Sequence, residues 1–329
     1  MDMNEEHHHR LALIGARGYT GRELLERVMR HPSIGLALAS SGAQAGRPIT
    51  DEVPDWPDPA QEFVALGPEQ VAEVDADLWA LAVPNGASGP WVAAIEAAHP
   101  DAVIIDFGAD YRFDPDWVYG LTEFNREALV GAKRISNPGC YATGAQFGLL
   151  PIRDRLAAPP VVFGVSGYSG AGRTPSPRND PERLADNLIP YALSGHVHEH
   201  EISAHLGRPV RFHPHVAAFF RGISLTISVT LTEPFTAAGL LAGFEAVYGD
   251  EALIAVREQV PEVRDLVDGR GLPRAGLAVG GFSVDERDGH RATFVVVLDN
   301  LLKGAAGQAL QNLNVALGLD ERLGLEDLT

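Results

Sequence analysis

Residues 11–21 read LALIGARGYTG, and this stretch decides the fold of the first part of the chain. The apolar run Leu11–Ile14 predicts a short buried strand, and a helical pattern follows Gly21. Glycines between a strand and a helix let the backbone approach a pyrophosphate, which binds at the positive end of the helix dipole. The spacing is GxxGxxG rather than GxGxxG, so a plain glycine-rich turn is the alternative, but the flanking elements favour dinucleotide binding. The cofactor contacts predicted here are Gly15, Gly18, Tyr19, Thr20 and Gly21.

Short apolar runs continue the alternation of strands and helices. They lie at Ile34–Ala39, Leu78–Val83 and Ala102–Asp106. This rhythm predicts an α/β fold with a Rossmann-type, doubly wound parallel sheet. Beyond about residue 140 the strand candidates lengthen, at Val161–Val165, Gly222–Leu231 and Ala292–Leu298. Longer strands of this kind predict a second, α+β domain with a more antiparallel sheet.

The last part of the chain returns to a helical pattern. Its apolar positions, which form one face of a helix, are Leu302, Ala306, Leu310, Leu313 and Leu317. We therefore predict a dinucleotide-binding domain over residues 1–139, with the C-terminal helix at 300–329 packing back on it. The catalytic domain is predicted over residues 140–299.

Length and charge exclude several classes of protein. A chain of 329 residues fits two domains, and 26 basic against 44 acidic residues give a net charge of −18. Such a charge repels phosphate backbones and anionic bilayers, so we expect neither nucleic acid nor a membrane as a partner. One cysteine cannot form an internal disulfide, and the first ten residues lack the apolar segment of a signal peptide. We expect a cytoplasmic protein.

The end of the second predicted strand indicates which dinucleotide binds. NAD-selective folds carry an acidic residue about 20 positions beyond the glycine loop, where it holds the ribose 2′-hydroxyl. Here that region reads Ser40-Ser41-Gly42, and Arg47 follows. Two hydroxyls and an arginine suit a 2′-phosphate, so the sequence predicts NADP.

The single cysteine lies in an unusual setting. Cys140 follows Asn137-Pro138-Gly139, a sharp turn, and precedes a helical run that ends near Pro151. A lone cysteine is usually an inert, small apolar residue. At a helix N-terminus, however, the dipole and the exposed N–H groups stabilise a thiolate and could also receive an oxyanion. A thiolate nucleophile beside a nicotinamide domain predicts acyl-thioester chemistry with hydride transfer.

Six of the twelve histidines lie between His196 and His215, and the segment GHVHEHE at 195–201 holds three of them. The segment is either a polar surface turn, a source of the general acid/base for the cysteine, or a metal site. A closed zinc site needs four ligands, and the only thiol lies far away in sequence, so no metal is predicted. The pattern itself does not choose among His196, His198 and His200.

Together these motifs resemble the N-acetyl-γ-glutamyl-phosphate reductase family of arginine biosynthesis, over nearly the whole chain. The matching segments are Gly15–Gly21, Asp106–Phe113, Ser136–Thr143, Val165–Gly172, Pro190–Ile202, Phe219–Gly222 and Asp299–Ala306. The resemblance implies a semialdehyde-dehydrogenase fold and NADPH-dependent reduction of N-acetyl-γ-glutamyl phosphate to N-acetylglutamate semialdehyde and phosphate. It also implies a homodimer or homotetramer formed through the catalytic domain.

The resemblance further implies roles for particular residues. Cys140 would attack the acyl phosphate to give a thioester, and His198, the second histidine of the family's HxHxxEI pattern, would be the acid/base. Arg112 and Arg221 match family arginines near the substrate, and forked guanidinium groups suit its carboxylate and phosphate.

Three further positions carry implied roles. The loop Ser166–Gly172, with Ser169 and Gly170, is a plausible anion cradle, with a flexible turn as the alternative. Asn300 resembles the residue that holds the nicotinamide amide, although it could also cap the last helix. Pro84 belongs to the loop near the nicotinamide.

Two positions depart from the family's usual pattern. Residues 83–86 read Val-Pro-Asn-Gly where many members have Leu-Pro-His-Gly, which leaves the role of the loop intact. His200 stands where many members have proline, so this chain offers an additional histidine as acid/base.

Three other functions compete with this reading. The first is a related reductase, either aspartate-semialdehyde dehydrogenase or the lysine-pathway enzyme with a carrier-bound substrate; an acidic carrier would be repelled by a charge of −18. The second is a non-catalytic NADP sensor, which would not need Cys140. The third is a metal-dependent hydrolase, which stoichiometric zinc would reveal.

Overall fold

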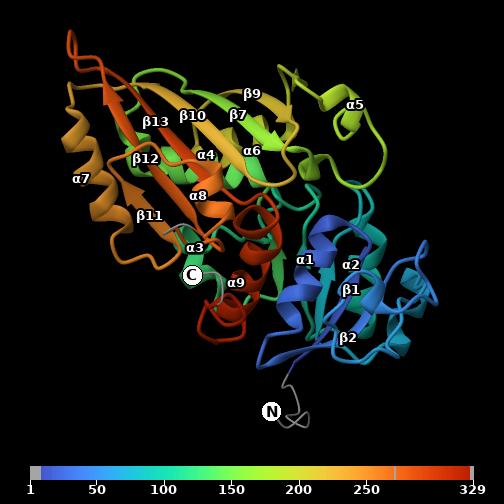
Figure 1. The fold of residues 1–329 in the computed structure, drawn as a ribbon. Helices are drawn as coiled ribbons and strands as arrows, with labels where there is room; N and C mark the ends of the chain where they lie inside the picture. The colour runs from blue at the N-terminus through green and yellow to red at the C-terminus, as the bar shows by residue number, and fades with distance from the viewer. Residues whose placement is uncertain (1–8, 270–271, 327–329) are drawn as a thin grey trace. The chain divides into compact units, whose positions relative to one another are not determined.

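The computed structural model describes residues 9–269 and 272–326, so residues 1–8 and 327–329 of the predicted domain bounds lie outside it. The described chain divides into two compact units (Figure 1). The first unit runs to Pro138 and includes the segment that begins at Ala305, and the second runs from Gly139 to Gly304. Each unit has its own sheet, and the predicted α/β class is confirmed.

The first unit contains a six-stranded, entirely parallel sheet in the order β2-β1-β3-β4-β6-β5. Its strands are β1 His9–Ile14, β2 Ile34–Ser40, β3 Leu78–Leu81, β4 Val103–Asp106, β5 Val118–Tyr119 and β6 Arg134–Ser136. Its helices are α1 Tyr19–Val28, α2 Ser88–Ala98, α3 Thr122–Leu129 and α9 Gly307–Ala316, with short 3-10 turns η1 Ile49–Asp51 and η2 Pro68–Glu73. The predicted parallel sheet is confirmed.

The order of these strands indicates where in the first unit a dinucleotide would bind. Strand β2 lies on one side of β1 and β4 on the far side of β3, so right-handed crossovers put α1 and α2 on opposite faces of the sheet. One face buries Trp79 and Ile104 against Ile95 of α2. The chain order reverses between β1 and β3, and in doubly wound sheets dinucleotides bind beyond the carboxyl ends of the strands at such a switch point.

The second unit contains a seven-stranded mixed sheet in the order β11-β12-β13-β10-β7-β9-β8. Its strands are β7 Val161–Gly167, β8 Leu188–Pro190, β9 Arg211–Ala217, β10 Ile223–Thr230, β11 Ile254–Arg257, β12 Leu277–Val284 and β13 Arg291–Leu298. Its helices and 3-10 turns are α4 Cys140–Leu149, η3 Leu150–Arg155, η4 Tyr168–Ala171, α5 Pro181–Leu184, α6 Val197–Leu206, α7 Ala237–Tyr248 and α8 Val263–Val267. Antiparallel pairs join β7 to β10, β10 to β13 and β13 to β12, as predicted for this part of the chain.

Helix α4 packs closely on this sheet because two of its residues are glycines (Figure 1). A Cβ atom on Gly144 would lie 2.7 Å from the Leu225 side chain, and one on Gly148 would lie 2.5 Å from that of Ile227. Side chains alternate along a strand, so the other face of the sheet presents Thr226 and, on the neighbouring strand, Phe163. Phe163 is 38% exposed there.

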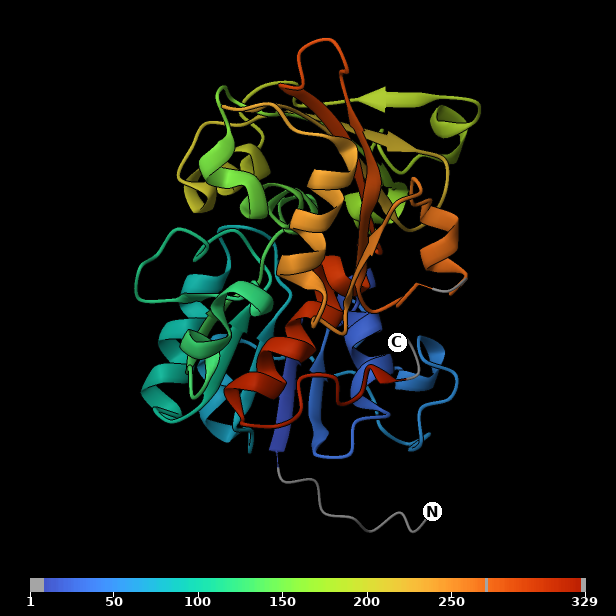
Figure 2. The ribbon, with the colours of Figure 1, turned by 90° about the vertical axis from the view of Figure 1, so that its left-hand side faces the viewer.

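The C-terminal helix differs from the sequence prediction. The spacing of its leucines predicts a single apolar face, but all ten residues of α9 are buried. The helix begins at Gly307, after a π-helical turn at Leu302–Ala306, and packs against α1 and α3 (Figure 2). Its polar side chains are Gln308, Gln311, Asn312 and Asn314.

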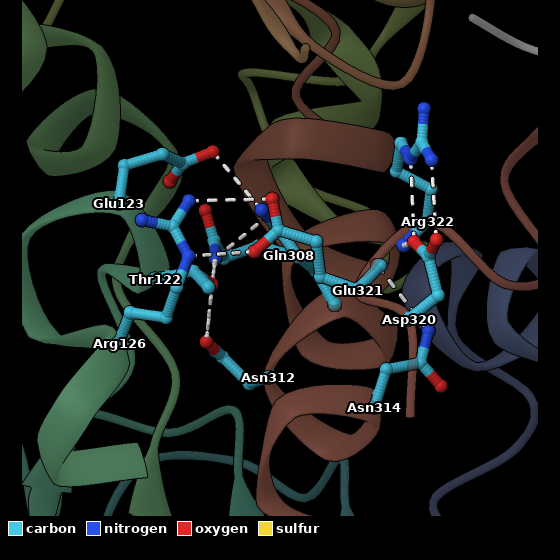
Figure 3. Close-up of polar contacts among 10 residues, drawn as sticks. Thr122, Glu123, Arg126, Gln308, Asn312, Asn314, Asp320, Glu321 and Arg322 are labelled. Atoms are coloured by element: carbon cyan, nitrogen blue, oxygen red, sulfur yellow. Dashed lines mark hydrogen bonds and ion pairs between the residues drawn. The ribbon is translucent and has the colours of Figure 1, made fainter. Parts of the chain in front are cut away.

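Hydrogen bonds within the first unit explain how these polar side chains are buried. Asn312 accepts a hydrogen bond from the Thr122 hydroxyl at 2.6 Å and donates to the carbonyl of Gly120 at 2.8 Å. Gln308 also donates to Thr122, and Asn314 pairs with the buried His31 at 2.9 Å. Figure 3 shows the Thr122 side chain directed at this helix. Buried polar groups with partners of this kind are tolerated in a core.

In the part of the chain that the structure describes, no helix combines the length and the apolar character needed to cross a membrane.

Candidate active site

The glycine loop forms a tight turn at the carboxyl end of β1. Gly15 has a φ of +85°, and a Cβ there would lie 2.2 Å from the carbonyl oxygen of Ala82. The N–H groups of Gly15 and Ala16 donate to the carbonyl of Ser40, at 3.1 and 2.9 Å. A Cβ on Gly21 would lie 2.8 Å from Cα of Ala16. The fold itself therefore requires glycine at positions 15 and 21.

Gly18 is different, because nothing in the fold demands a glycine there. Its φ is −62°, and the nearest atom to an added Cβ is 3.8 Å away. It is the N-cap of α1, and no side chain caps this helix; Tyr19 and Thr20 begin its first turn. A small residue before an uncapped helix start provides room and N–H donors for a pyrophosphate. This loop therefore fits a dinucleotide.

The carboxyl end of β2 brings the predicted ribose-side residues next to the glycine loop. Ser40 and Ser41 are both buried, and the Ser40 carbonyl is the group that receives the N–H of Gly15. Arg47 is exposed, and its guanidinium lies 2.8 Å from the carboxylate of Asp51. Exposed pairs of this kind contribute little to stability, so the arginine can exchange Asp51 for another anion.

The loops after β3 and β4 are joined by two carboxylates that the sequence analysis did not select. Asp110 accepts hydrogen bonds from the N–H of Gly86 at 2.6 Å and of Ser88 at 3.1 Å. Asp106 accepts from the Ser88 hydroxyl at 2.6 Å, and burial raises the pKa of this carboxyl. The loop that contains Pro84 is thus held at the carboxyl edge of the sheet. The sequence did carry a signal for these two carboxylates: two acidic residues lie on either side of a glycine at the end of a predicted strand.

Arg112 is buried and holds the backbone before the cysteine. Its Nε donates to the carbonyl of Asn137 at 3.0 Å, and one terminal nitrogen donates to the carbonyl of Phe107 at 2.8 Å. The Asn137 side chain accepts a further hydrogen bond from Asn312 at 3.1 Å. The turn that leads to Cys140 is therefore anchored through Asn137. Contact of Arg112 with substrate stays a prediction.

Cys140 is the first residue of α4, as the sequence predicts for the helix start. The N-cap Gly139 is extended, with φ −71° and ψ 145°, and no side chain caps the helix. The thiol is partly buried, and a Cβ on Gly304 would lie 2.7 Å from that of Cys140. Glycine at 304 therefore lets the chain pass directly beside the cysteine. An uncapped helix start favours the thiolate form.

Glu201 is a further residue that the sequence analysis passed over, although it quoted the motif that contains it. Its carboxylate is fully buried and accepts a hydrogen bond from the N–H of Gly139 at 2.8 Å. Glu201 lies on α6, three residues after His198 and therefore on the same side of that helix. Helices α4 and α6 pack together, and this carboxylate links α6 to the residue before Cys140. The signal for Glu201 in the sequence was an acidic residue directly before the apolar Ile202, within the histidine motif.

The structure separates the three histidines of the 195–201 segment. His196 is the N-cap of α6, and its Nδ1 accepts from the N–H of His198 at 3.0 Å. Burial, with a contribution from the charge of Arg178, lowers the pKa of His196 to about 4. His198 is partly buried, its ring 5.9 Å from that of Tyr141, whereas His200 is exposed.

These environments favour His198 as the partner of the cysteine. Its ring neighbours the residue after Cys140, His196 is already used in capping, and His200 faces solvent. Among the described residues, no group of three or more His, Cys, Asp or Glu side chains is placed to hold a metal ion.

Three of the motifs meet in the second unit around Asn300. The Asn300 amide donates to the Ser169 hydroxyl at 2.9 Å and accepts from the N–H of Gly222 at 2.7 Å. Arg221 donates to the buried carboxylate of Asp299 at 2.6 Å. Asn300 is thus occupied in joining the Ser169 loop to the segment after Arg221. Its predicted contact with a nicotinamide stays a prediction.

Comparison with known families agrees with this site. Residues 10–132 match the family model described as semialdehyde dehydrogenase, NAD binding domain, and residues 140–300 match the model described as semialdehyde dehydrogenase, dimerisation domain. The fold and the site therefore define a protein of the semialdehyde dehydrogenase class.

Curated relatives narrow this class. The N-acetyl-gamma-glutamyl-phosphate reductase of Stenotrophomonas maltophilia (strain R551-3) is 49% identical, over 94% of this chain and 96% of the relative. That of Xanthomonas campestris pv. campestris (strain B100) is 47% identical over the same shares. The chain belongs to the N-acetyl-gamma-glutamyl-phosphate reductase family, and the resemblance inferred from the sequence motifs is confirmed.

Solved structures share the fold at low sequence identity. Aspartate semialdehyde dehydrogenase II of Vibrio cholerae, complexed with ASA, gives a TM-score of 0.73 at 20% identity, covering 94% of this chain and 98% of that one. The Candida albicans aspartate semialdehyde dehydrogenase with NADP gives 0.65 at 16% identity, covering 98% and 99%. At such identities the likeness establishes the fold alone.

Proposed function

We propose that this chain catalyses the NADPH-dependent reduction of N-acetyl-γ-glutamyl phosphate to N-acetylglutamate semialdehyde and phosphate, in arginine biosynthesis. The names of the relatives support the substrate. The observation that carries the chemistry is Cys140 at the uncapped start of α4, with His198 on the packed neighbour α6. A nucleophilic thiol with an imidazole on the adjacent helix is the arrangement that acyl transfer needs.

The reaction begins at Cys140. Its thiolate attacks the acyl carbon, a C–S bond forms, and the C–O bond to the phosphoryl group breaks, which releases phosphate and leaves a thioester. The N–H groups at the start of α4 stabilise the oxyanion that forms during this attack. NADPH, when held by the proposed cofactor contacts, would supply the hydride for reduction of the thioester carbonyl. The hemithioacetal anion then collapses to the aldehyde and the Cys140 thiolate, a step that consumes no proton. The one proton that the overall reaction consumes passes from His198 to the leaving phosphate in the first step.

The two units divide these tasks. We propose that the first unit is the NADP-binding domain and the second the catalytic and oligomerisation domain. The proposed NADP contacts are Gly15, Gly18, Tyr19, Thr20, Gly21, Ser40, Ser41, Arg47, Pro84 and Asn300. The proposed substrate contacts are Arg112, Ser169, Gly170 and Arg221. The match of residues 140–300 to a dimerisation model supports a homodimer or a homotetramer, and the biosynthetic role suggested by the relatives supports a cytoplasmic location.

The reverse reaction tests the proposal. NADP reduction by N-acetylglutamate semialdehyde is measured with and without phosphate, for the wild type and for Cys140→Ser. We expect reduction that requires phosphate and that falls at least a thousandfold in the variant, because a hydroxyl is a far weaker nucleophile than a thiolate. Reduction without phosphate would indicate a hydrolytic semialdehyde dehydrogenase. Folded protein that binds NADP but reduces none would indicate another acyl substrate or a sensor.

A matched pair of variants tests the acid/base. His198→Asn should lower kcat by about 10²- to 10⁴-fold, the usual contribution of general acid–base catalysis. His200→Asn, two residues away and exposed, should leave kcat within about twofold. Equal losses in the two variants would contradict the assignment of His198.

A further inference from the structure

Arg178 lies in the segment that follows the Ser169 loop. Neither the sequence motifs nor the proposed mechanism assigns this arginine a role. Its guanidinium carbon lies over the ring of Tyr191, 4.8 Å from the centroid. The Tyr191 ring meets that of His196 edge-on at 5.6 Å, and the His196 ring is 4.8 Å from that of His198. Contacts between rings therefore connect Arg178 to the histidines of the active site.

The electrostatics of Tyr191 connect the same arginine to the cysteine. Burial is the main cause that raises the pKa of Tyr191 to about 12. A charge on Cys140 raises it too, while the charge of Arg178 and its hydrogen bond to Tyr191 lower it. The thiol and the guanidinium thus act on one phenol, in the same unit.

The loop around Arg178 is held in a defined conformation. The Asn179 amide donates to the carbonyls of Gly172 and Thr174, at 2.7 and 2.8 Å, and accepts from the N–H of Ser176 at 2.7 Å. Gly172 is the last residue of the proposed anion cradle. Arg178 is therefore anchored to that cradle through the residue next to it.

The charge of Arg178 has no acidic counterpart within the described ranges. Its exposed side chain forms no ion pair there, although the chain has 44 acidic residues and only 26 basic ones. Some exposed arginines, such as Arg155 and Arg291, are paired with carboxylates, whereas Arg183, exposed in the same segment as Arg178, likewise has no ion pair among the described residues. The contact with the Tyr191 ring holds the guanidinium group beside that ring. A guanidinium has five N–H donors, so Arg178 can donate to an oxyanion as well as to Tyr191.

We propose that Arg178 binds an oxyanion of the acyl-phosphate substrate, namely its phosphoryl group or its carboxylate, alongside the Ser169 loop. This inference rests on the proposed function and identifies a further substrate contact in the same site. Arg178 is a binding residue in this proposal, so its loss affects KM rather than the chemical step.

The reverse reaction separates the two oxyanions, because phosphate and the carboxylate-bearing aldehyde are then different substrates. KM for each is measured for the wild type, Arg178→Ala, Arg178→Lys and Arg183→Ala. Arg183 is the matched control, since it lies in the same segment and is also exposed. We expect Arg178→Ala to raise one KM about tenfold, with kcat nearly unchanged, because an exposed charge-assisted hydrogen bond is lost. Arg178→Lys should recover part of this loss, and Arg183→Ala should match the wild type.

The measured KM values show which oxyanion Arg178 binds, and whether the inference or the proposed function fails. A higher KM for phosphate alone assigns Arg178 to the phosphoryl group, and a higher KM for the aldehyde alone assigns it to the carboxylate. If both KM values stay within twofold of an active wild type, the inference about Arg178 is wrong and the proposed function stands. If the wild type shows no phosphate-dependent activity, the proposed function fails and the inference falls with it.

Discussion

At the scale of the residue, environment gives two neighbouring histidines different properties. His196 and His198 lie two positions apart in one segment, and each has a glutamate within the next three positions. In the structure His196 accepts a backbone hydrogen bond at the start of α6, and burial keeps it neutral near pH 7. This leaves His198 as the proposed acid/base. The distinction comes from burial and capping, which the repeated HxHxH pattern does not encode.

The lowered pKa of His196 predicts a stability that depends on pH. Its pKa is about 4 in the folded protein and 6.5 as the reference for the unfolded chain, so between these values only the unfolded state takes up a proton at this residue. The free energy of unfolding should therefore fall as the pH falls from 6.5 to 4. Urea unfolding at several pH values measures this. His196→Gln should make the decline shallower, and the exposed His200→Gln should not; equal slopes in all three proteins would contradict the prediction.

At the scale of the element, α9 is a helix whose polar residues are as buried as its leucines. The Asn312 side chain makes four hydrogen bonds, with Thr122, Gln308, Gly120 and Asn137. The last of these lies in the turn before the proposed nucleophile. The helix therefore stabilises the first unit and also holds Asn137, from which the turn toward the proposed nucleophile departs.

Replacing Asn312 with leucine should destabilise the first unit. The substitution leaves the buried carbonyl of Gly120 without this partner, and we expect a loss of about 2–4 kcal/mol, visible as a lower midpoint of thermal or urea unfolding. The exposed Asn187→Leu is the control and should change stability by less than about 0.5 kcal/mol. A neutral Asn312→Leu would show that this network adds nothing to stability.

At the scale of the whole molecule, charge and surface indicate what the chain associates with. A net charge of −18 disfavours anionic polymers. The second unit, in contrast, presents Phe163 on the face of its sheet that points away from α4, and that residue is 38% exposed. An exposed aromatic ring on a β-sheet face fits an interface between two copies of the chain.

We expect sedimentation to show a particle of at least twice the chain mass of 35.2 kDa. Phe163→Glu should shift this particle toward the monomer, because a buried charge at an interface lacks a partner. The matched surface variant Phe113→Glu, at a residue that is also exposed but lies in the first unit, should sediment as the wild type does. A wild type that sediments as a monomer would contradict the proposed oligomer.

The sequence by itself determined the fold class, the parallel first sheet, the glycine turn, the position of Cys140 at a helix start and the family. These follow from local patterns, because strand alternation, glycine spacing and helix boundaries are set by neighbouring residues. Only the tertiary structure decided that Glu201 binds Gly139, 62 residues away, that α9 is buried on all sides, and that Arg178 lies over Tyr191. Burial and hydrogen-bond partners between distant segments arise when elements pack together, and a linear pattern does not specify which polar group meets which.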